Sequence, residues 1–251
     1  MTELTNTELE RYARHIVLPE LGGIGQRRLK QSSVAVIGAG GVGSAVIPAL
    51  AGAGIGRLTI IDDGSVERSN LQRQTLFRDD QIDVSKAQLA TGFVGALNPD
   101  IAVHGIGERI DASNAEALLG GHDLIVDGCD NFATRLVVGD TATRLQIPLV
   151  SAAAVQFQGQ VALFRGWEAR KPCYRCFVGE AFDTDDCDNC ADLGVLGALT
   201  ATAGSFAALV AIRALASIGE DSAGKLFLFN GLTLEWRTIR LPKDSGCKSC
   251  G

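Results

Sequence analysis

The feature that most constrains this chain is a glycine-rich turn directly after a short apolar run. Residues 33–43 read Ser-Val-Ala-Val-Ile-Gly-Ala-Gly-Gly-Val-Gly, in which Gly38, Gly40 and Gly43 match G-x-G-x-x-G. Such a strand–turn–helix opens a Rossmann-type sheet, because the glycines permit a tight turn and bring a nucleotide close to the free N–H groups of a helix start. A nucleotide-binding α/β protein is therefore predicted, and a glycine turn used only for packing is the alternative.

The next segment places an acidic side chain where a nucleotide ribose would lie. Residues 57–63 are predicted to form a second strand that ends in Asp62 and Asp63. Asp62 stands 19 residues after Gly43, and an acidic residue at this position of the fold binds a ribose hydroxyl. The alternative is a turn aspartate in front of Gly64.

The remaining apolar segments predict a parallel half followed by a run of strands. Helices are predicted at 44–53, 86–97, 114–119 and 132–145, and strands at 101–106, 124–126, 148–155, 159–165, 226–230 and 235–241. Near the N-terminus, Thr5 or Thr7 can cap a helix that runs to about His15, and a second helix covers 26–31. We predict a single α/β domain over 1–251, with a short helical segment at 1–31. Its Rossmann-like mixed sheet is largely parallel in the N-terminal half and continues into antiparallel strands.

A polar segment follows the second predicted strand. Residues 69–74 read Ser-Asn-Leu-Gln-Arg-Gln, and Lys86 lies near the start of the helix after them. A cation near a helix N-terminus opposes the helix dipole, and such a placement is often accidental. It gains meaning beside Arg73, because a triphosphate needs several cations to offset its charge.

Carboxylates follow the predicted strand 124–126, in the run Asp-Gly-Cys-Asp-Asn at 127–131. Ligands of open parallel sheets bind outside the carboxyl ends of the strands, so Asp127 and Asp130 are expected to face the same crevice as the glycine turn. A carboxylate beside phosphates normally acts through Mg²⁺. The alternative for Asp130 is the N-cap of the following helix, and both roles are compatible.

The seven cysteines include three Cys-x-x-Cys pairs, and Cys129 is single. The N-terminus is polar and acidic, unlike a secretory signal, so the pairs indicate metal or redox chemistry inside a cell. Four thiolates from Cys173, Cys176, Cys247 and Cys250 would hold a structural zinc ion. The middle pair, Cys187 and Cys190, competes for the metal. It lies in an acidic stretch that is expected to be a mobile loop, where aspartates raise the pKa of a thiol.

Charge and hydropathy argue against nucleic-acid and membrane partners. The net charge of −6 argues against a nucleic-acid surface. Residues 193–212 carry no charged side chain, but they are rich in Gly, Ala, Thr and Ser. This composition indicates a buried helix of a cytoplasmic protein and not a membrane span.

Together these motifs resemble the bacterial activating enzymes of ubiquitin-like sulfur carriers, the MoeB/ThiF group of adenylyltransferases that serve molybdopterin synthase and thiamine thiazole synthesis. The likeness runs from about Arg11 to the last residue. It rests on the glycine turn, Asp62-Asp63, Lys86, the segments 69–74, 127–131 and 173–176, and the terminal Cys-Lys-Ser-Cys.

The resemblance implies that the chain binds Mg²⁺ and ATP in the crevice and adenylates the C-terminal Gly-Gly carboxylate of a small sulfur carrier. By this resemblance Gly41 touches the nucleotide, Asp62 the ribose, and Asp130 the Mg²⁺, while Asn70, Arg73 and Lys86 contact the phosphates. The implied nucleotide-binding set is Gly38, Gly40, Gly41, Gly43, Asp62, Ser69, Asn70, Leu71, Gln72, Arg73, Lys86, Asp130 and Asn131. The implied catalytic set is Arg14, Arg73, Lys86, Asp130 and Cys190.

The resemblance also implies protein partners. Arg14 matches an arginine that the family contributes across a homodimer interface, although a helix arginine is usually just solvated. Cys190 matches a loop cysteine that forms a covalent link with the carrier in some members. No rhodanese-like domain follows Cys250, so a separate desulfurase or rhodanese-type protein is expected to donate the sulfur.

Three other functions are compatible with parts of the pattern. An NAD-dependent oxidoreductase would share the glycine turn and Asp62, but it gives no reason for Arg73, Lys86 and Asp130 together. An ATP-dependent enzyme that activates a carboxylate on a tRNA base is a second alternative, against which the acidic charge and the cysteine pairs argue. A zinc-held scaffold without activity is a third, and it predicts no ATP binding.

Overall fold

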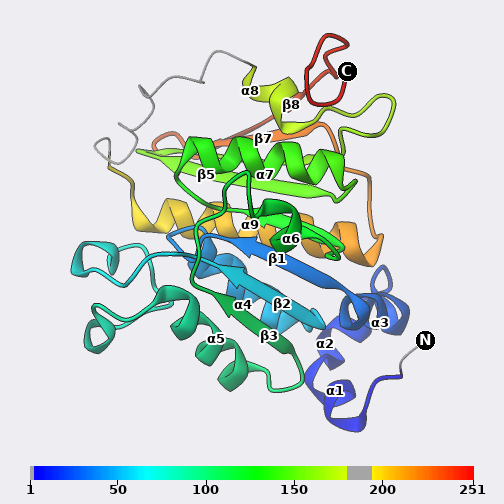
Figure 1. The fold of residues 1–251 in the computed structure, drawn as a ribbon. Helices are drawn as coiled ribbons and strands as arrows, with labels where there is room; N and C mark the ends of the chain where they lie inside the picture. The colour runs from blue at the N-terminus through cyan, green and yellow to red at the C-terminus, as the bar shows by residue number, and fades with distance from the viewer. Residues whose placement is uncertain (1–2, 180–193) are drawn as a thin grey trace.

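An eight-stranded mixed sheet runs through the computed structural model, which describes residues 3–179 and 194–251 (Figure 1). Its strands are β1 (Ser33–Ile37), β2 (Arg57–Ile61), β3 (Ala102–Ile106), β4 (Leu124–Asp127), β5 (Leu149–Val155), β6 (Gln158–Phe164), β7 (Lys225–Asn230) and β8 (Glu235–Arg240). They lie in the order β3-β2-β1-β4-β5-β6-β7-β8. The first five are parallel and the last three pair antiparallel, which confirms the predicted mixed sheet.

Helices cover both faces of this sheet (Figure 1). One layer holds α3 (Gly22–Gln31), α4 (Gly43–Ala53), α5 (Lys86–Leu97) and α9 (Gly197–Ala216), and the other holds α6 (Ala115–Leu119), α7 (Phe132–Arg144) and α8 (Tyr174–Val178). Successive residues of β1 alternate between the two cores: Val34 and Val36 face the α4 layer, whereas Ala35 and Ile37 face the α7 layer. A strand buried on both faces needs a continuous apolar run, which is the pattern at 34–37.

Helix α9 is long and apolar enough to cross a bilayer by length and composition. In this structure it packs against α4, β5 and β6 as part of the core. A Cβ atom at Gly204 would come within 2.3 Å of the Val42 carbonyl oxygen, so the small residues of this helix permit close packing on α4. The predicted buried helix is confirmed, although it begins at Gly197 instead of residue 193.

The predicted N-terminal helix is wrong in its extent. It is divided at Tyr12 into α1 (Asn6–Arg11) and α2 (Ala13–Ile16). Thr5 caps α1 as predicted: its Oγ1 accepts a hydrogen bond from the Glu8 N–H at 3.2 Å. The helix breaks because Tyr12 is buried, and its hydroxyl accepts a 2.8 Å hydrogen bond from the Asn98 side chain.

The other predicted elements agree with the structure to within two residues, apart from α3, which begins four residues early, and α8, which was missed. Two short 3-10 turns, η1 (Arg68–Asn70) and η2 (Asp79–Gln81), lie between β2 and α5. A helix of five residues is too short to show a period in the sequence, which is why α8 gave no signal.

Candidate functional site

Three loops meet at the carboxyl ends of β1, β2 and β4. The N–H of Gly38 donates to the Ile61 carbonyl at 2.9 Å, and the N–H of Gly128 donates to the Ile37 carbonyl at the same distance. These bonds continue the sheet by one residue into each loop. The glycine turn, Asp62 and the 127–131 segment are therefore brought to one edge of the sheet, as predicted.

Different physical constraints require glycine at different positions of the turn. Gly38 has a φ of +85°, and a Cβ at Gly43 would lie 2.0 Å from the Gly38 carbonyl oxygen. A Cβ at Gly41 would meet Thr200 of α9 at 2.9 Å. At Gly40 the nearest atom to such a Cβ is 3.7 Å away, on the Gln74 side chain. Packing therefore requires Gly38, Gly41 and Gly43, whereas Gly40 has space beside it.

Backbone N–H groups without a partner lie beside the space at Gly40. Among the described residues, the N–H groups of Gly40 and Gly41 donate no hydrogen bond, and they lie just before α4 begins at Gly43. Free N–H groups at a helix N-terminus favour an anion.

The Asp62 carboxylate connects two of the loops. Its Oδ2 accepts a hydrogen bond from the Ala39 N–H at 2.7 Å, and its Oδ1 accepts one from the Gly64 N–H at 2.8 Å. The turn role that was the alternative is therefore present. The contact with Ala39 also places this carboxylate directly beside the glycine turn.

Cations lie near this carboxylate. Lys86 is the first residue of α5, and its Nζ would be 3.3 Å from a Cβ placed on Gly64. Within the described part of the chain, this half-buried ammonium has no hydrogen bond or ion pair. The Arg73 side chain donates to the Ser69 carbonyl at 3.1 Å, and it makes no ion pair with any residue that the structure describes. Unpaired charges this close to a nucleotide turn are available for an anionic ligand.

The segment 69–74 also holds buried polar atoms without partners. Among residues 3–179 and 194–251, Asn70 Oδ1 and Gln74 Oε1 have no hydrogen-bond partner, and the same holds for Ser44 Oγ in the first turn of α4. Buried polar groups are normally hydrogen-bonded, so each such atom indicates a missing ligand or water. Asn70 is a predicted site residue, whereas Ser44 and Gln74 were not predicted.

Ser69, Leu71 and Gln72 belong to the same segment but are placed differently. Ser69 is exposed and bonds Glu67 at 3.2 Å, and Leu71 packs on the core. A Cβ at Gly197 would lie 2.2 Å from the Gln72 carbonyl oxygen, so the start of α9 packs closely on this segment. This contact fixes the position of the segment 69–74 against α9.

Of the two aspartates at the end of β4 and in the loop after it, Asp127 is the last residue of the strand and is buried, so the prediction that it faces the crevice is wrong. It is 1% exposed, and its Oδ2 accepts a 3.1 Å hydrogen bond from Arg135 of α7. The reason is that the last residue of a central strand lies within the sheet, beneath the loop. Although burial opposes a charged guanidinium, the Asp127 carboxylate holds the pKa of Arg135 above its usual value.

Asp130 remains the candidate for a metal ligand. It is exposed, and in the described chain its carboxylate has no hydrogen bond or ion pair. The N-cap of α7 is Asn131, whose Oδ1 accepts from the Thr134 N–H at 2.9 Å. The cap interpretation of Asp130 is therefore wrong, and the side-chain oxygen of Asn131 is used by the helix.

Cys129 lies between these residues as a half-buried thiol. Burial and the nearby Asp127 carboxylate raise its pKa well above the usual value. A thiol held in its neutral form is a poor nucleophile.

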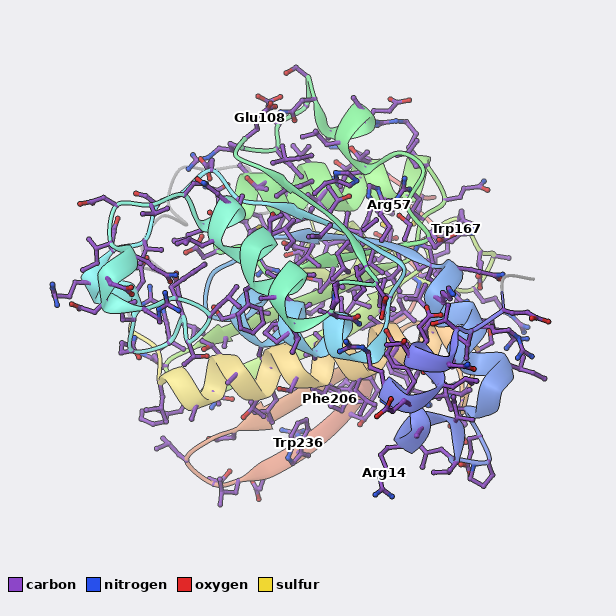
Figure 2. All side chains as sticks on the ribbon, turned by 90° about the horizontal axis from the view of Figure 1, so that it is seen from below. Arg14, Arg57, Glu108, Trp167, Phe206 and Trp236 are labelled. Carbon is purple, nitrogen blue, oxygen red and sulfur yellow. The ribbon has the colours of Figure 1, made fainter. Side chains whose placement is uncertain are left out.

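Arg14 lies at the other end of the molecule from the glycine turn. Its neighbour His15 bonds Gln26, which in turn donates to the carbonyl of Ala53, the last residue of α4. The glycine turn precedes the first residue of this eleven-residue helix, about 16 Å away. Arg14 is exposed, and Figure 2 shows its side chain pointing away from the body of the molecule. It cannot reach the crevice of its own chain.

The first and last cysteine pairs come together. The four sulfur atoms of Cys173, Cys176, Cys247 and Cys250 all lie within 4.8 Å of one another, and three of the separations are 3.4, 3.5 and 3.7 Å. Tetrahedral zinc with bonds of about 2.3 Å separates its sulfur ligands by about 3.8 Å, whereas a disulfide needs about 2.05 Å. The geometry fits a metal ion, and the N–H of Asp244 supplies a supporting 3.4 Å hydrogen bond to Cys176.

The ionisation of these thiols also bears on metal binding. Burial raises the pKa of Cys173 and raises that of Cys250 to about 11. For Cys247, burial is outweighed by the backbone N–H groups of Ser249 and Cys250, which lower its pKa. A metal would therefore displace protons from part of this set. Cys187 and Cys190 lie outside the described residues.

Sequence reasoning missed Arg135 and Tyr174, which lie behind the 127–131 loop. An arginine in a helix is normally predicted to be solvated, and no local pattern in the sequence indicates that Arg135 is buried, at 7% exposed. The spacing Asp127-x7-Arg135 would have placed it one helical turn past the loop, but only with the strand and helix already paired.

Comparison with known proteins places the chain in a family. It is 40% identical over 248 residues to the SAMP-activating enzyme E1 of Haloferax volcanii, covering 99% of this chain and 91% of that protein. It is 36% identical over 251 residues to the molybdopterin-synthase adenylyltransferase of Escherichia coli strain K12, covering 100% of both. The fold is similar to that of E. coli MccB with ATP, at a TM-score of 0.84 and 23% identity, over 98% of this chain and 75% of that one. The ThiF family model matches residues 12–249, and the chain belongs to the ThiF family.

Proposed function

We propose that this protein is an ATP-dependent adenylyltransferase that activates the C-terminal Gly-Gly carboxylate of a ubiquitin-like sulfur carrier, for molybdenum cofactor or thiamine biosynthesis. The observation that carries the proposal is one edge of the sheet where the loops after β1, β2 and β4 meet. Among the described residues, this edge brings together free N–H donors at Gly40 and Gly41, the Lys86 ammonium without a partner, and the loop of the Asp130 carboxylate. Relatives named as adenylyltransferases cover nearly the whole chain, which supports this function over an oxidoreductase, a tRNA-modifying enzyme or a scaffold.

ATP fits the donor set of this crevice. The triphosphate would lie against the glycine turn, with Arg73 and Lys86 offsetting its charge, and Asn70 would gain a partner for its buried oxygen. Asp62, already beside Ala39, would accept a ribose hydroxyl. The other expected binding residues, Gly38, Gly43, Ser69, Leu71 and Gln72, shape the turn and the segment that holds these groups.

The reaction needs positioning and charge neutralisation more than covalent catalysis by the protein. A carboxylate oxygen of the carrier attacks the α-phosphorus, the bond to the bridging oxygen breaks, and pyrophosphate leaves with the charge. Mg²⁺ held by Asp130 would supply neutralisation at the phosphates. Lys86 and Arg73 stabilise the charge that develops on the departing oxygens.

We expect ATP–pyrophosphate exchange by the purified protein with Mg²⁺ and a matching Gly-Gly carrier, and a loss of at least about 100-fold in Asp130→Ala, comparable to loss of one electrostatic group in other active sites. Each candidate carrier is supplied in turn, and Asp63→Ala serves as a matched surface control. Bound ATP without exchange, with every carrier, would move the function to another carboxylate substrate.

A homodimer would complete this site. Arg14 lies too far from the glycine turn to serve the site of its own chain. Its exposed side chain is on α2, next to which Val17 ends the helix and Ile24 lies in the contacting helix α3, and these two apolar side chains are 70% and 61% exposed. Exposed apolar side chains around an unpaired cation are typical of a protein interface. We propose that a second copy receives Arg14 beside its phosphates.

Mixing experiments test this arrangement. Arg14→Ala and Lys86→Ala are each expected to lose exchange activity, whereas subunits exchanged between the two variants regain up to one intact site in each mixed dimer. Recovery is measured after mild denaturation and joint refolding, with each variant refolded alone as the control. An Arg14→Ala protein that keeps full activity, or a mixture that regains none, contradicts the proposal.

The carrier would dock on the β7–β8 hairpin. Strand β8 is an edge strand whose residues are all exposed, and Figure 2 shows its Trp236 beside Phe206 of α9. The Trp236 ring packs on Phe206 and Phe229 at centroid distances of 5.2 and 4.7 Å. Exposed apolar edges are typical of partner-binding surfaces. A Cβ at Gly231 in the hairpin turn would be 3.0 Å from Leu199, near the start of α9. The hairpin turn is therefore near the segment 69–74, against which the start of α9 packs. A carrier seated here could send its tail into the crevice.

Further parts of the proposal concern the metal and the cellular setting. We propose that the four-cysteine cluster binds structural Zn²⁺, which its sulfur spacing fits. We further propose that residues 1–251 act as one adenylation domain in the cytoplasm. A separate sulfur donor protein would convert the adenylate, and Cys190 would act as the loop cysteine if a covalent link forms.

A further inference from the structure

Both spacer residues of the first cysteine pair contact helix α7. Arg175 forms a two-point ion pair with Asp140, with Nε–Oδ1 and Nη2–Oδ2 distances of 2.8 Å. Tyr174 points the other way and is buried, and a Cβ at Gly139 would lie 2.8 Å from its own Cβ. The cysteine cluster is therefore connected to α7 twice, by the Arg175–Asp140 ion pair on the outer side and by the packing of Tyr174 on the inner side.

The inner contact leads to Arg135, one turn earlier in α7. The Arg135 guanidinium interacts with the Tyr174 hydroxyl. Burial raises the pKa of Tyr174 to about 12, and it outweighs the lowering of that pKa by Arg135. The same guanidinium donates to Ser151 Oγ at 3.0 Å and to the Ala152 carbonyl at 2.8 Å, both on β5. These contacts hold its plane in one orientation.

Arg135 in turn holds the loop that carries Asp130. It donates to Asp127 Oδ2 at 3.1 Å and to the Cys129 carbonyl oxygen. Asp127 Oδ1 accepts the Cys129 N–H at 3.1 Å. Both polar groups of the Cys129 backbone are thus bound, directly before Asp130.

We propose that Arg135 is a positioning residue for the magnesium site, and that Tyr174 connects it to the cysteine cluster. The inference rests on the proposed function for the role of Asp130. Because the peptide at Cys129 sets the direction in which the chain leaves toward Asp130, a tilt of the guanidinium moves that carboxylate. The cysteine cluster then supports the chemistry as well as the C-terminal segment.

Tyr174→Phe tests the connection, because it removes one hydroxyl and keeps the packing of the ring. We expect full metal content and unchanged ATP binding without Mg²⁺, but Mg²⁺-dependent ATP affinity weakened by about 10-fold, as when other outer-shell partners of a metal ligand are lost. Calorimetric titration of ATP at several Mg²⁺ concentrations measures this. It does not depend on any carrier, so it stays informative if the protein adenylates something else.

Asp140→Asn is the matched control, since it removes the ion pair between Arg175 and Asp140 that joins the same two helices and leaves Arg135 unchanged. It should bind Mg²⁺ and ATP within about twofold of the parent, because this partly exposed ion pair makes no contact with Arg135 and such pairs contribute little. Unchanged Mg²⁺ dependence in Tyr174→Phe, or equal weakening in Asp140→Asn, overturns the proposal. Should Tyr174→Phe lose its metal, Ser151→Ala decides instead: it removes one of the two hydrogen bonds that Arg135 donates to β5, and a parent-like Mg²⁺ dependence there overturns the proposal as well.

Discussion

Replacing Cys250 with serine is expected to empty the four-cysteine site and to lower the free energy of unfolding by several kcal/mol. Metal that binds the folded chain and not the unfolded one adds its binding energy to folding, and structural zinc binds peptides with an apparent ~10–16 kcal/mol at neutral pH. The cluster joins residues 173–176 to the C-terminal end, which otherwise contacts the body through few bonds, such as Lys243 to the Gly166 carbonyl at 2.8 Å.

Two measurements check this expectation. Bound metal is quantified with a chromogenic chelator after unfolding, and stability is measured by urea titration. Cys129→Ser is the matched control, because Cys129 is a cysteine outside the cluster, and it should keep the full metal content. A Cys250→Ser protein that retains both its metal and its urea midpoint would show that the cluster does not stabilise the fold.

Replacing Arg135 with methionine is expected to destabilise the protein by about 3–5 kcal/mol, the usual result of removing one partner of a buried ion pair. The side chains of Arg135 and Asp127 are 9% and 1% exposed, so the Asp127 carboxylate would be left charged in the interior. The carbonyl of Ala152 would also lose its 2.8 Å donor. The measurement is the shift in the denaturant midpoint at constant m-value.

The double variant Asp127→Asn with Arg135→Met separates the two sources of this loss. Removing the buried charge should recover a substantial part of the stability, because an amide needs no counter-charge. A single variant that loses less than ~1 kcal/mol, or a double variant less stable than the single one, would mean that the ion pair is not what holds this region.

The nucleotide end of the site could be predicted from the sequence because its signals are local. The strand at 34–37, the glycine turn and the helix after it are adjacent in the chain, and the backbone conformation of Gly38 depends on its immediate neighbours. Asp62 was found in the same way, since the end of a strand can be counted from an apolar run. The edge that gathers these loops then follows from the general rule for parallel sheets.

Other features needed the tertiary structure because they depend on residues far apart in the chain. The sequence could not distinguish Asp127 from Asp130, since only the paired sheet buries one and leaves the other exposed. The sequence did predict that Cys173 and Cys247 share a site, but it left Cys187 and Cys190 as competitors, and only the folded chain brings the two sulfur atoms to 3.5 Å across 74 positions. The break at Tyr12 has the same origin, a hydrogen bond to Asn98 that no local pattern encodes.

By itself, then, the sequence determined the residue types of the crevice and the order of strands and helices, because propensity, periodicity and turn chemistry act over a few residues. Only the tertiary structure decided which carboxylate is neutralised by Arg135, how closely the predicted four cysteines approach one another, and that Arg14 faces away from the glycine turn of its own chain. Those outcomes are set by packing between distant segments, where burial converts a charge from a solvated group into one that must find a partner.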